Sequence, residues 1–303
     1  MGDRIFYGLC AIAGLLTIFV LVEVVYQLIS GASPSISRFG VGFLGHSRWA
    51  ANFGIFGAAA AIYGTLMSSL MALTLATPLG IAIGLYLSMM APPAIRAVVG
   101  PLVEMLAAIP SVILGFWGVA VLAPFAAKYL EPWLHSVFGF IPLFGEPQTT
   151  GLSIFTAGLG LTLMVLPIIA ALSRDLFLTV PGELKDGAAA LGATRWEIIR
   201  GVVLPTTVSG VAAATVLGLG RALGEAIAVT QMIGDGAGIH ASLFLPGNSL
   251  ASRIATEYTV SENKLEIPSL FYLALILLVI GLVTSVLARI ISSRFDVQRT
   301  LAR

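Results

Sequence analysis

The stretch Asp186–Pro205, DGAAALGATRWEIIRGVVLP, is a polar interruption between two long apolar runs. Thr194 and Glu197 have the T-x-x-E spacing of a capping box, so the spacing predicts a helix that begins after Thr194. The small residues before Gly192 favour another short helix, and Pro205 marks the start of the next apolar segment. The pattern predicts two short helices at a membrane surface, hinged at Gly192.

The composition of the whole chain indicates a membrane protein. Of its residues, 58% are hydrophobic and 10% are charged, and the mean hydropathy is +1.00, whereas soluble domains carry about 25% charged residues. Apolar stretches of about 20 residues can cross the hydrocarbon core as helices. The fold class predicted is therefore all-α, a polytopic membrane protein with about six transmembrane helices. The expected spans are 6–30, 62–90, 98–126, 151–173, 206–233 and 268–291.

The first apolar run is predicted to be a retained helix. It is too long for the apolar part of a secretory signal, and no clear A-x-A cleavage site follows it. Cys10 is the only cysteine, so an internal disulfide and a cysteine metal cluster are both excluded. No metal site is expected elsewhere.

The distribution of Lys and Arg predicts the orientation of the spans. If both termini are cytoplasmic, the inner segments carry ten of the 16 basic residues, the outer ones carry five, and Arg221 lies within a span. Cytoplasmic loops carry the excess of positive charge in membrane proteins. We therefore expect a multi-pass protein of the cell (inner or plasma) membrane, with both termini and the stretch 186–205 in the cytoplasm.

Two external connections carry residues suited to contacts. The first, 31–62, has five aromatic residues, which either anchor helix ends at the membrane interface or form a docking surface for an external partner. They are Phe39, Phe43, Trp49, Phe53 and Phe56. The last, 235–267, carries Glu257, Glu262 and Glu266 and is polar enough to meet a soluble partner.

Three ionisable residues within the expected spans are candidates for an anion pathway. Arg221 and Glu225 are four residues apart, so on a continuous helix they share one face. Charges inside a bilayer normally face the bundle interior or water. Either the two residues neutralise each other, or Arg221 lies near an anion pathway, where its donor fork suits phosphate-like oxygens. Glu104 lies between two prolines of the third expected span and is the third candidate.

The motifs of several enzyme classes are absent from the sequence. No lysine is followed by Ser or Thr, so a G-x-x-x-x-G-K-[ST] phosphate loop is excluded. No H-E-x-x-H or G-x-S-x-G occurs either. We expect neither catalytic residues nor a cofactor bound by this chain. If transport is driven by ATP, another subunit binds the ATP and Mg²⁺.

The stretch 186–205 resembles the EAA loop of ABC importer permeases, E-A-A-x-x-x-G followed, after nine residues, by I-x-L-P. Asp for Glu and Gly for the first Ala are departures, and the glycine costs that helix about 1 kcal/mol. The resemblance implies a type I permease fold and contact with an ATPase. The implied coupling residues are Asp186, Gly187, Ala188, Gly192, Glu197, Leu204 and Pro205.

Longer stretches resemble the permeases of the high-affinity phosphate importer, the PstC-type subunit in particular. They are Met105–Gly118, Leu166–Pro181, Leu191–Pro205 and Gly218–Val229. The resemblance implies import of inorganic phosphate, with a PstA-type second permease, a homodimeric PstB-type ATPase and an extracytoplasmic PstS-type phosphate-binding protein as partners. Membrane lipid is the other expected partner, and nucleic acid is not.

The domain organisation predicted has three parts. They are an N-terminal helix with an external loop (1–61), a permease domain (62–291) with its coupling loop at 182–205, and a basic cytoplasmic tail (292–303). Rival functions are a permease for sulfate, molybdate or another oxyanion, a secondary transporter or channel, and a membrane scaffold or sensor. A transporter without an ATPase would leave the 186–205 pattern without a purpose.

Overall fold

The computed structural model describes residues 2–261 and 263–294, and in these ranges the chain is helical apart from its connections. An isolated bridge between Ala50 and Ile55 is the one strand-like pairing found there. Within the same ranges, six helices are long and apolar enough to cross a membrane. They are Asp3–Phe39, Ala59–Met90, Ser111–Phe138, Ile154–Leu178, Arg195–Gly224 and Glu266–Ile290.

Several spans are built from more than one helical segment, because π-type turns interrupt them at 86–90, 118–122, 126–130 and 199–203. The α-helices are α1 Gly2–Phe39, α2 Gly42–Gly45, α3 Ala59–Leu85, α4 Pro93–Ala107, α5 Ser111–Trp117, α6 Ala123–Phe125, α7 Glu131–Phe138, α8 Ile154–Leu178, α9 Gly182–Ala190, α10 Arg195–Ile198, α11 Leu204–Gly224, α12 Ile227–Met232, α13 Leu250–Glu257 and α14 Glu266–Arg294.

Helix α8 is the centre of the bundle. Of its most apolar window, 72% is buried, against 28% or less in the other spans. Helix α3 lies against it at very short range, because a Cβ on Gly80 would stand 2.9 Å from Ile169 Cγ2 and one on Gly84 would stand 2.9 Å from the Arg174 backbone nitrogen. Small residues at such a contact let two membrane helices approach closely.

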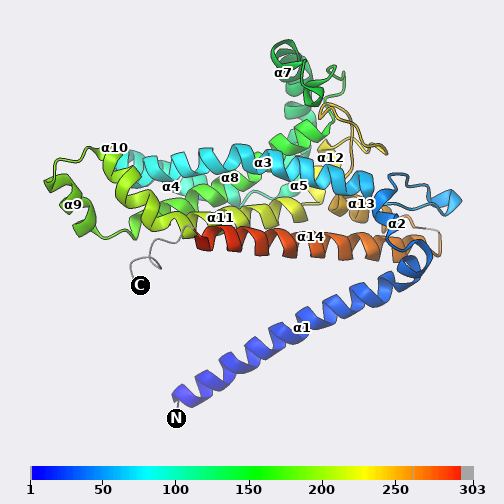
Figure 1. Cartoon of the computed structure of the whole chain (residues 1–303), viewed down its shortest axis with the longest axis horizontal. Coiled ribbons are helices and arrows are strands. Elements are labelled where there is room, and N and C mark those ends of the chain that lie inside the picture. Colours follow the sequence, from blue (N-terminus) through cyan, green and yellow to red (C-terminus); the bar gives the residue numbers. More distant parts are fainter. Residues whose placement is uncertain (1, 262, 295–303) are drawn as a thin grey trace.

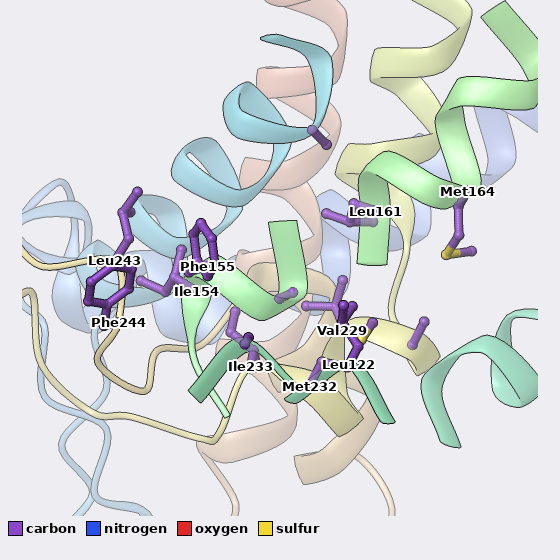
Figure 2. Close-up of a cluster of buried hydrophobic side chains, with 14 residues drawn as sticks. Leu122, Ile154, Phe155, Leu161, Met164, Val229, Met232, Ile233, Leu243 and Phe244 are labelled. Atoms are coloured by element: carbon purple, nitrogen blue, oxygen red, sulfur yellow. The ribbon is translucent and has the colours of Figure 1, made fainter. Parts of the chain in front are cut away.

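A buried apolar cluster joins α8 to α12 and to the loop that follows α12. Figure 2 shows Phe155 of α8 beside Phe244 of the loop, and their ring centroids lie 5.3 Å apart in an edge-on arrangement. Met232 of α12 packs against the glycines of its neighbours, since a Cβ on Gly118 or Gly160 would overlap its side chain. Gly115 also lies against α12, since a Cβ there would overlap the side chain of Gln231.

The two ends of the bundle carry different elements (Figure 1). Helices α9 and α10 lie at one end. The last residues of α14 and the first residues of α1 point toward this end as well. The opposite end carries α2 and α13, α12 lies inward of them, and α7 projects from one side of the bundle. Helix α1 packs on α14 only through its second half, where Gly31 meets Phe271 and Ser35 lies 3.1 Å from Ser269. Its first half slants away from the bundle with its apolar side chains exposed.

The aromatic residues of the first connection mostly form an internal cluster. Phe43 and Phe56 are fully buried, and Phe43 stacks on Tyr272 of α14 with ring centroids 4.5 Å apart. Trp49 lies edge-on to Phe56. These residues hold the connection to α14, so neither of the two functions considered for them, interface anchoring or docking, describes the buried pair. Phe53 alone remains widely exposed, at 76%.

Two of the expected spans are wrong in one respect. The third, 98–126, is not a single helix, because α4 ends at Ala107 and α5 begins after Pro110, which has no backbone N–H to continue a helix. The fifth, 206–233, is divided at Glu225, whose backbone is extended (φ −72°, ψ 116°). The tail 292–303 was expected to be separate, but α14 continues to Arg294, and 295–303 lies outside the described residues, as does Glu262.

Replacing Gly64 of α3 with alanine should destabilise the fold. A Cβ there would overlap the backbone carbonyl of Asn248, which holds the loop before α13 against α3. Because backbone must move, we expect a loss of about 1–3 kcal/mol, as for overpacked cores. Thermal unfolding in detergent measures it. Gly14→Ala, with nothing within 4 Å, is the control, and equal midpoints for the two variants would contradict the prediction.

Candidate functional site

The polar stretch 182–205 forms a compact unit, here called the coupling unit, at one end of the bundle (Figure 1). Helix α9 follows Pro181, and a left-handed residue, Gly192 (φ +87°), turns the chain toward α10. Residues with a side chain rarely adopt that conformation, so glycine suits the turn. The prediction of two short helices hinged at Gly192 is confirmed.

The expected capping box is present at the start of α10. Thr194 Oγ1 accepts from the Glu197 backbone N–H at 3.4 Å, and Glu197 Oε2 accepts from the Thr194 backbone N–H at 2.7 Å. The Thr194 hydroxyl also donates to Glu197 Oε2 at 2.8 Å. The Glu197 carboxylate is thus committed to the cap, which makes it a structural part of the unit rather than a free contact group.

The remaining implied coupling residues fall into two groups. Asp186, Gly187 and Gly192 are exposed on the unit, with nothing within 4 Å of a Cβ on either glycine. Ala188, Leu204 and Pro205 are half-buried. They lie on the side of the unit that faces the bundle, where an apolar cluster packs the unit against the long helices. Its buried members are Phe177, Val180, Ile198, Val203 and Val211.

Large apolar side chains on the outer face of the unit were not among the expected site residues. Leu191 is 91% exposed, Trp196 is 63% exposed and Leu184 is 51% exposed. Large exposed apolar side chains on an otherwise polar segment favour contact with another protein. The sequence shows that the segment contains large apolar residues. Only the folded unit shows which of them pack into the internal cluster and which remain exposed.

The three candidate anion-pathway residues are not brought together. Glu104 of α4 forms an ion pair with Arg174, which lies near the end of α8. Arg174 Nη2 lies 2.8 Å from Glu104 Oε1. Arg174 Nη2 also lies 2.7 Å from Asp175 Oδ1. This pairing ties α4 to α8 near the coupling end, and Arg174 was not expected to take part in it.

Arg221 and Glu225 do not share a helix face, so that expectation is wrong. Helix α11 ends at Gly224, and the Glu225 carboxylate accepts from the Ala228 backbone N–H at 3.3 Å, in the first turn of α12. Arg221 is exposed, and the described residues provide it with no ion pair. It lines a groove of about 690 Å³ together with Ile168, Leu217, Gly220 and Ser285.

This groove is apolar apart from Arg221 and Ser285, and it continues beyond α11. A second groove of about 490 Å³ shares Gly220 and Ser285 with it and extends along α14 to Leu28 of α1. Gly220 and Gly224 leave this side of α11 open, since nothing lies within 4 Å of a Cβ on either. Among the described residues that line the two grooves, Arg221 is the one basic group.

Comparison with known proteins identifies the family to which this helical bundle belongs. The model of the binding-protein-dependent transport system inner membrane component matches residues 76–297. The chain belongs to this family. It is accordingly an inner membrane component of a transport system and a transport subunit rather than an enzyme.

Within that family, the chain is similar to phosphate transport system permease proteins named PstC. It is 40% identical to the protein of Mesorhizobium japonicum over 97% of this chain and 91% of that one. It is 42% identical to the protein of Pasteurella multocida over 91% and 87%. The expected resemblance to PstC-type permeases is confirmed.

Solved structures confirm the fold. A bacterial alginate ABC transporter, solved with an alginate-bound periplasmic protein, matches with a TM-score of 0.62 at 17% identity, over 95% of each chain. The inward-facing MetNI methionine ABC transporter matches with a TM-score of 0.53 at 20% identity, over 80% of this chain and 95% of that one. The predicted all-α ABC importer permease fold is thus correct.

Replacing Thr194 with alanine should loosen α10 without unfolding the bundle. The Glu197 N–H loses its acceptor, and loss of an N-cap costs about 0.5–2 kcal/mol. Amide hydrogen exchange over 194–203 should accelerate by a factor of about 2 to 30, whereas α9 should be unchanged. Thr194→Ser retains the hydroxyl and is the control. Unaltered exchange in the alanine variant would show that the cap does not hold the unit.

Proposed function

We propose that the chain is the permease subunit of an ATP-driven importer of inorganic phosphate and forms half of the translocation pathway. The observation that carries this is the similarity to PstC phosphate permeases at 40% identity over 97% of the chain. The exposed coupling unit supports it, because its apolar outer face is suited to an energy-supplying partner. The proposed partners are a PstA-type permease, a homodimeric PstB-type ATPase and a PstS-type binding protein.

Energy would enter through the coupling unit. In the proposed arrangement, ATP and Mg²⁺ are bound by the ATPase, this chain holds no cofactor, and both termini lie in the cytoplasm with α9 and α10. Movement of the ATPase against Leu191 and Trp196 would pass through the apolar base of the unit to α8 and α11. In this proposal, the cytoplasmic end would open by separation of α4 from α8 at the Glu104–Arg174 ion pair, whose Glu104 side chain is half-exposed to water.

The test of this function is uptake of labelled phosphate by proteoliposomes that contain the whole complex. We expect uptake that requires both ATP and the binding protein, with sulfate and molybdate as poor competitors. Uptake inhibited by sulfate or molybdate as strongly as by unlabelled phosphate would assign another oxyanion. Uptake that is indifferent to ATP would assign a secondary transporter.

Changing the outer face of the coupling unit should weaken binding of the ATPase to this chain. Asp186→Lys combined with Leu191→Ser reverses a charge and removes an exposed apolar side chain, and it leaves the capping box intact. Residues at the centre of an interface often account for a tenfold or larger share of affinity. Pull-down of the ATPase should fall at least about tenfold. Glu146→Lys, an exposed change at the opposite end of the bundle, is the control. Wild-type association and transport-coupled ATPase activity in the double variant would contradict the prediction.

Arg221→Gln should slow transport by at least about tenfold, because the planar donor fork for phosphate oxygens is lost. Assembly and basal ATPase activity should stay normal, since Arg221 supports no contact within the described chain. Arg221→Lys retains the charge without the fork and should lie between the two. Normal transport by the glutamine variant would remove Arg221 from the anion pathway.

A further inference from the structure

A polar pocket lies at the end of the bundle opposite the coupling unit. Its volume is about 450 Å³, and its lining comes from the connection that precedes α3, from the loop that joins α13 to α14 and from the adjoining ends of these two helices. The residues that line it are Ala51, Asn52, Glu257, Val260, Asn263 and Glu266. Its charged lining is acidic only.

Glu266 is the unusual member of this lining. The residue is 3% exposed, and across the described chain its carboxylate has neither a hydrogen bond nor an ion pair. It is the first residue of α14, where the helix dipole favours a negative charge. Buried charges in proteins are normally paired. A buried carboxylate that lines a cavity and has no partner in the described chain therefore points to a cation that comes from outside the chain.

The neighbouring charges cannot supply this cation. Arg253, 8% exposed as a residue, already pairs with Glu257 at 3.0 Å and with Asp235 at 3.6 Å, and its guanidinium lies over Trp49. Lys264 is exposed in the same loop and forms no ion pair with Glu266 in this structure. The local cluster therefore has more carboxylates than basic groups.

The walls of the pocket are fixed by the chain itself. Asn263 Nδ2 donates to the Ala51 carbonyl at 2.8 Å, and Asn263 Oδ1 accepts from the Leu265 N–H at 3.0 Å. This side-chain amide thus joins the two segments that border the pocket, although they are more than 200 residues apart in sequence. The pocket is preformed, so a ligand loses little free energy in ordering it.

The chemistry of the lining favours an organic cation over a metal ion. Calcium takes six or more oxygen ligands, and Mg²⁺ about six, whereas no cluster of three metal-ligating side chains is found in the described ranges. One of the two carboxylates is already shared with Arg253. A lysine ammonium or an arginine guanidinium needs fewer ligands and matches a pocket with two carboxylates.

The rim of the pocket is suited to a protein. Val260 in the lining is 65% exposed, and Phe53, which follows the lining residue Asn52 in sequence, is 76% exposed. Aromatic and apolar groups around a charged centre are typical of protein interfaces. We propose that this pocket receives a Lys or Arg side chain of the soluble extracytoplasmic binding protein. The proposal rests on the proposed function, which places this end of the bundle outside the cytoplasm.

The test measures affinity of the binding protein for the complete complex in lipid nanodiscs. Glu266→Gln keeps the size of the side chain and removes its charge, and it leaves both Arg253 ion pairs intact. We expect affinity to fall at least about tenfold, because one member of a buried charge pair is lost. The affinity of the glutamine variant should also depend less on salt than that of the wild type. Glu146→Gln makes the same change on an exposed residue at the same end of the bundle and should have no effect.

A second pair of variants keeps the test valid if Glu266→Gln does not assemble. Val260→Lys places a positive charge at the exposed edge of the pocket and should also weaken binding, whereas Val260→Gln, a neutral polar change, should not. Equal affinity of the wild type and Glu266→Gln, or of Val260→Lys and Val260→Gln, would overturn the proposal. Loss of wild-type binding in EDTA would overturn it too, in favour of a metal ion.

The outcomes separate this inference from the proposed function. If the wild-type complex imports phosphate and binds the protein while Glu266→Gln does the same with unchanged affinity, only the pocket assignment fails. If the wild-type complex neither imports phosphate nor binds an extracytoplasmic protein, the proposed function fails and the pocket has no such partner.

Discussion

The close contact of α3 with α8 is the constraint on which the rest of the molecule depends. Lipid offers apolar side chains as good an environment as another helix does, so membrane helices associate through packing that only small residues allow. Gly80 and Gly84 provide that packing against Ile169 and the backbone at Arg174. Because α8 is fixed in this way, Arg174 at its end can hold α4 through Glu104, and the coupling unit can root itself beside Phe177.

Regular and local features were the ones that the sequence could predict. The spans follow from apolar length alone, and the cap of α10 follows from two residues three positions apart. Gly192 and its turn are also local. The breaks were harder to predict. Pro110 could have been recognised as the end of a helix. Glu225 has no helix-breaking chemistry of its own, and its extended backbone occurs together with a hydrogen bond from the Ala228 N–H to its carboxylate.

The contacts of the charged residues were harder still to predict from local sequence patterns. Spacing predicted that Arg221 and Glu225 lie together, because spacing assumes a continuous helix, and the break between α11 and α12 separates their roles. The Glu104–Arg174 pair joins residues 70 positions apart, which no local pattern reports. Glu266 could be seen in the sequence as one of several external acidic residues, but its burial and its lack of a partner are properties of the folded chain.

The placement of charge also bears on how the complex is completed. Glu104, Arg174, Glu225 and Arg253 all have partners within the chain, whereas Arg221 lies along an apolar groove between helices that would stand at membrane depth. A basic side chain left facing lipid there costs several kcal/mol. Under the proposed function, the cost is avoided if a second permease subunit covers this side of α11 and Arg221 faces the aqueous path between the two. The open glycine face at Gly220 and Gly224 would then serve the approach of that subunit, which is why it contacts nothing in the single chain.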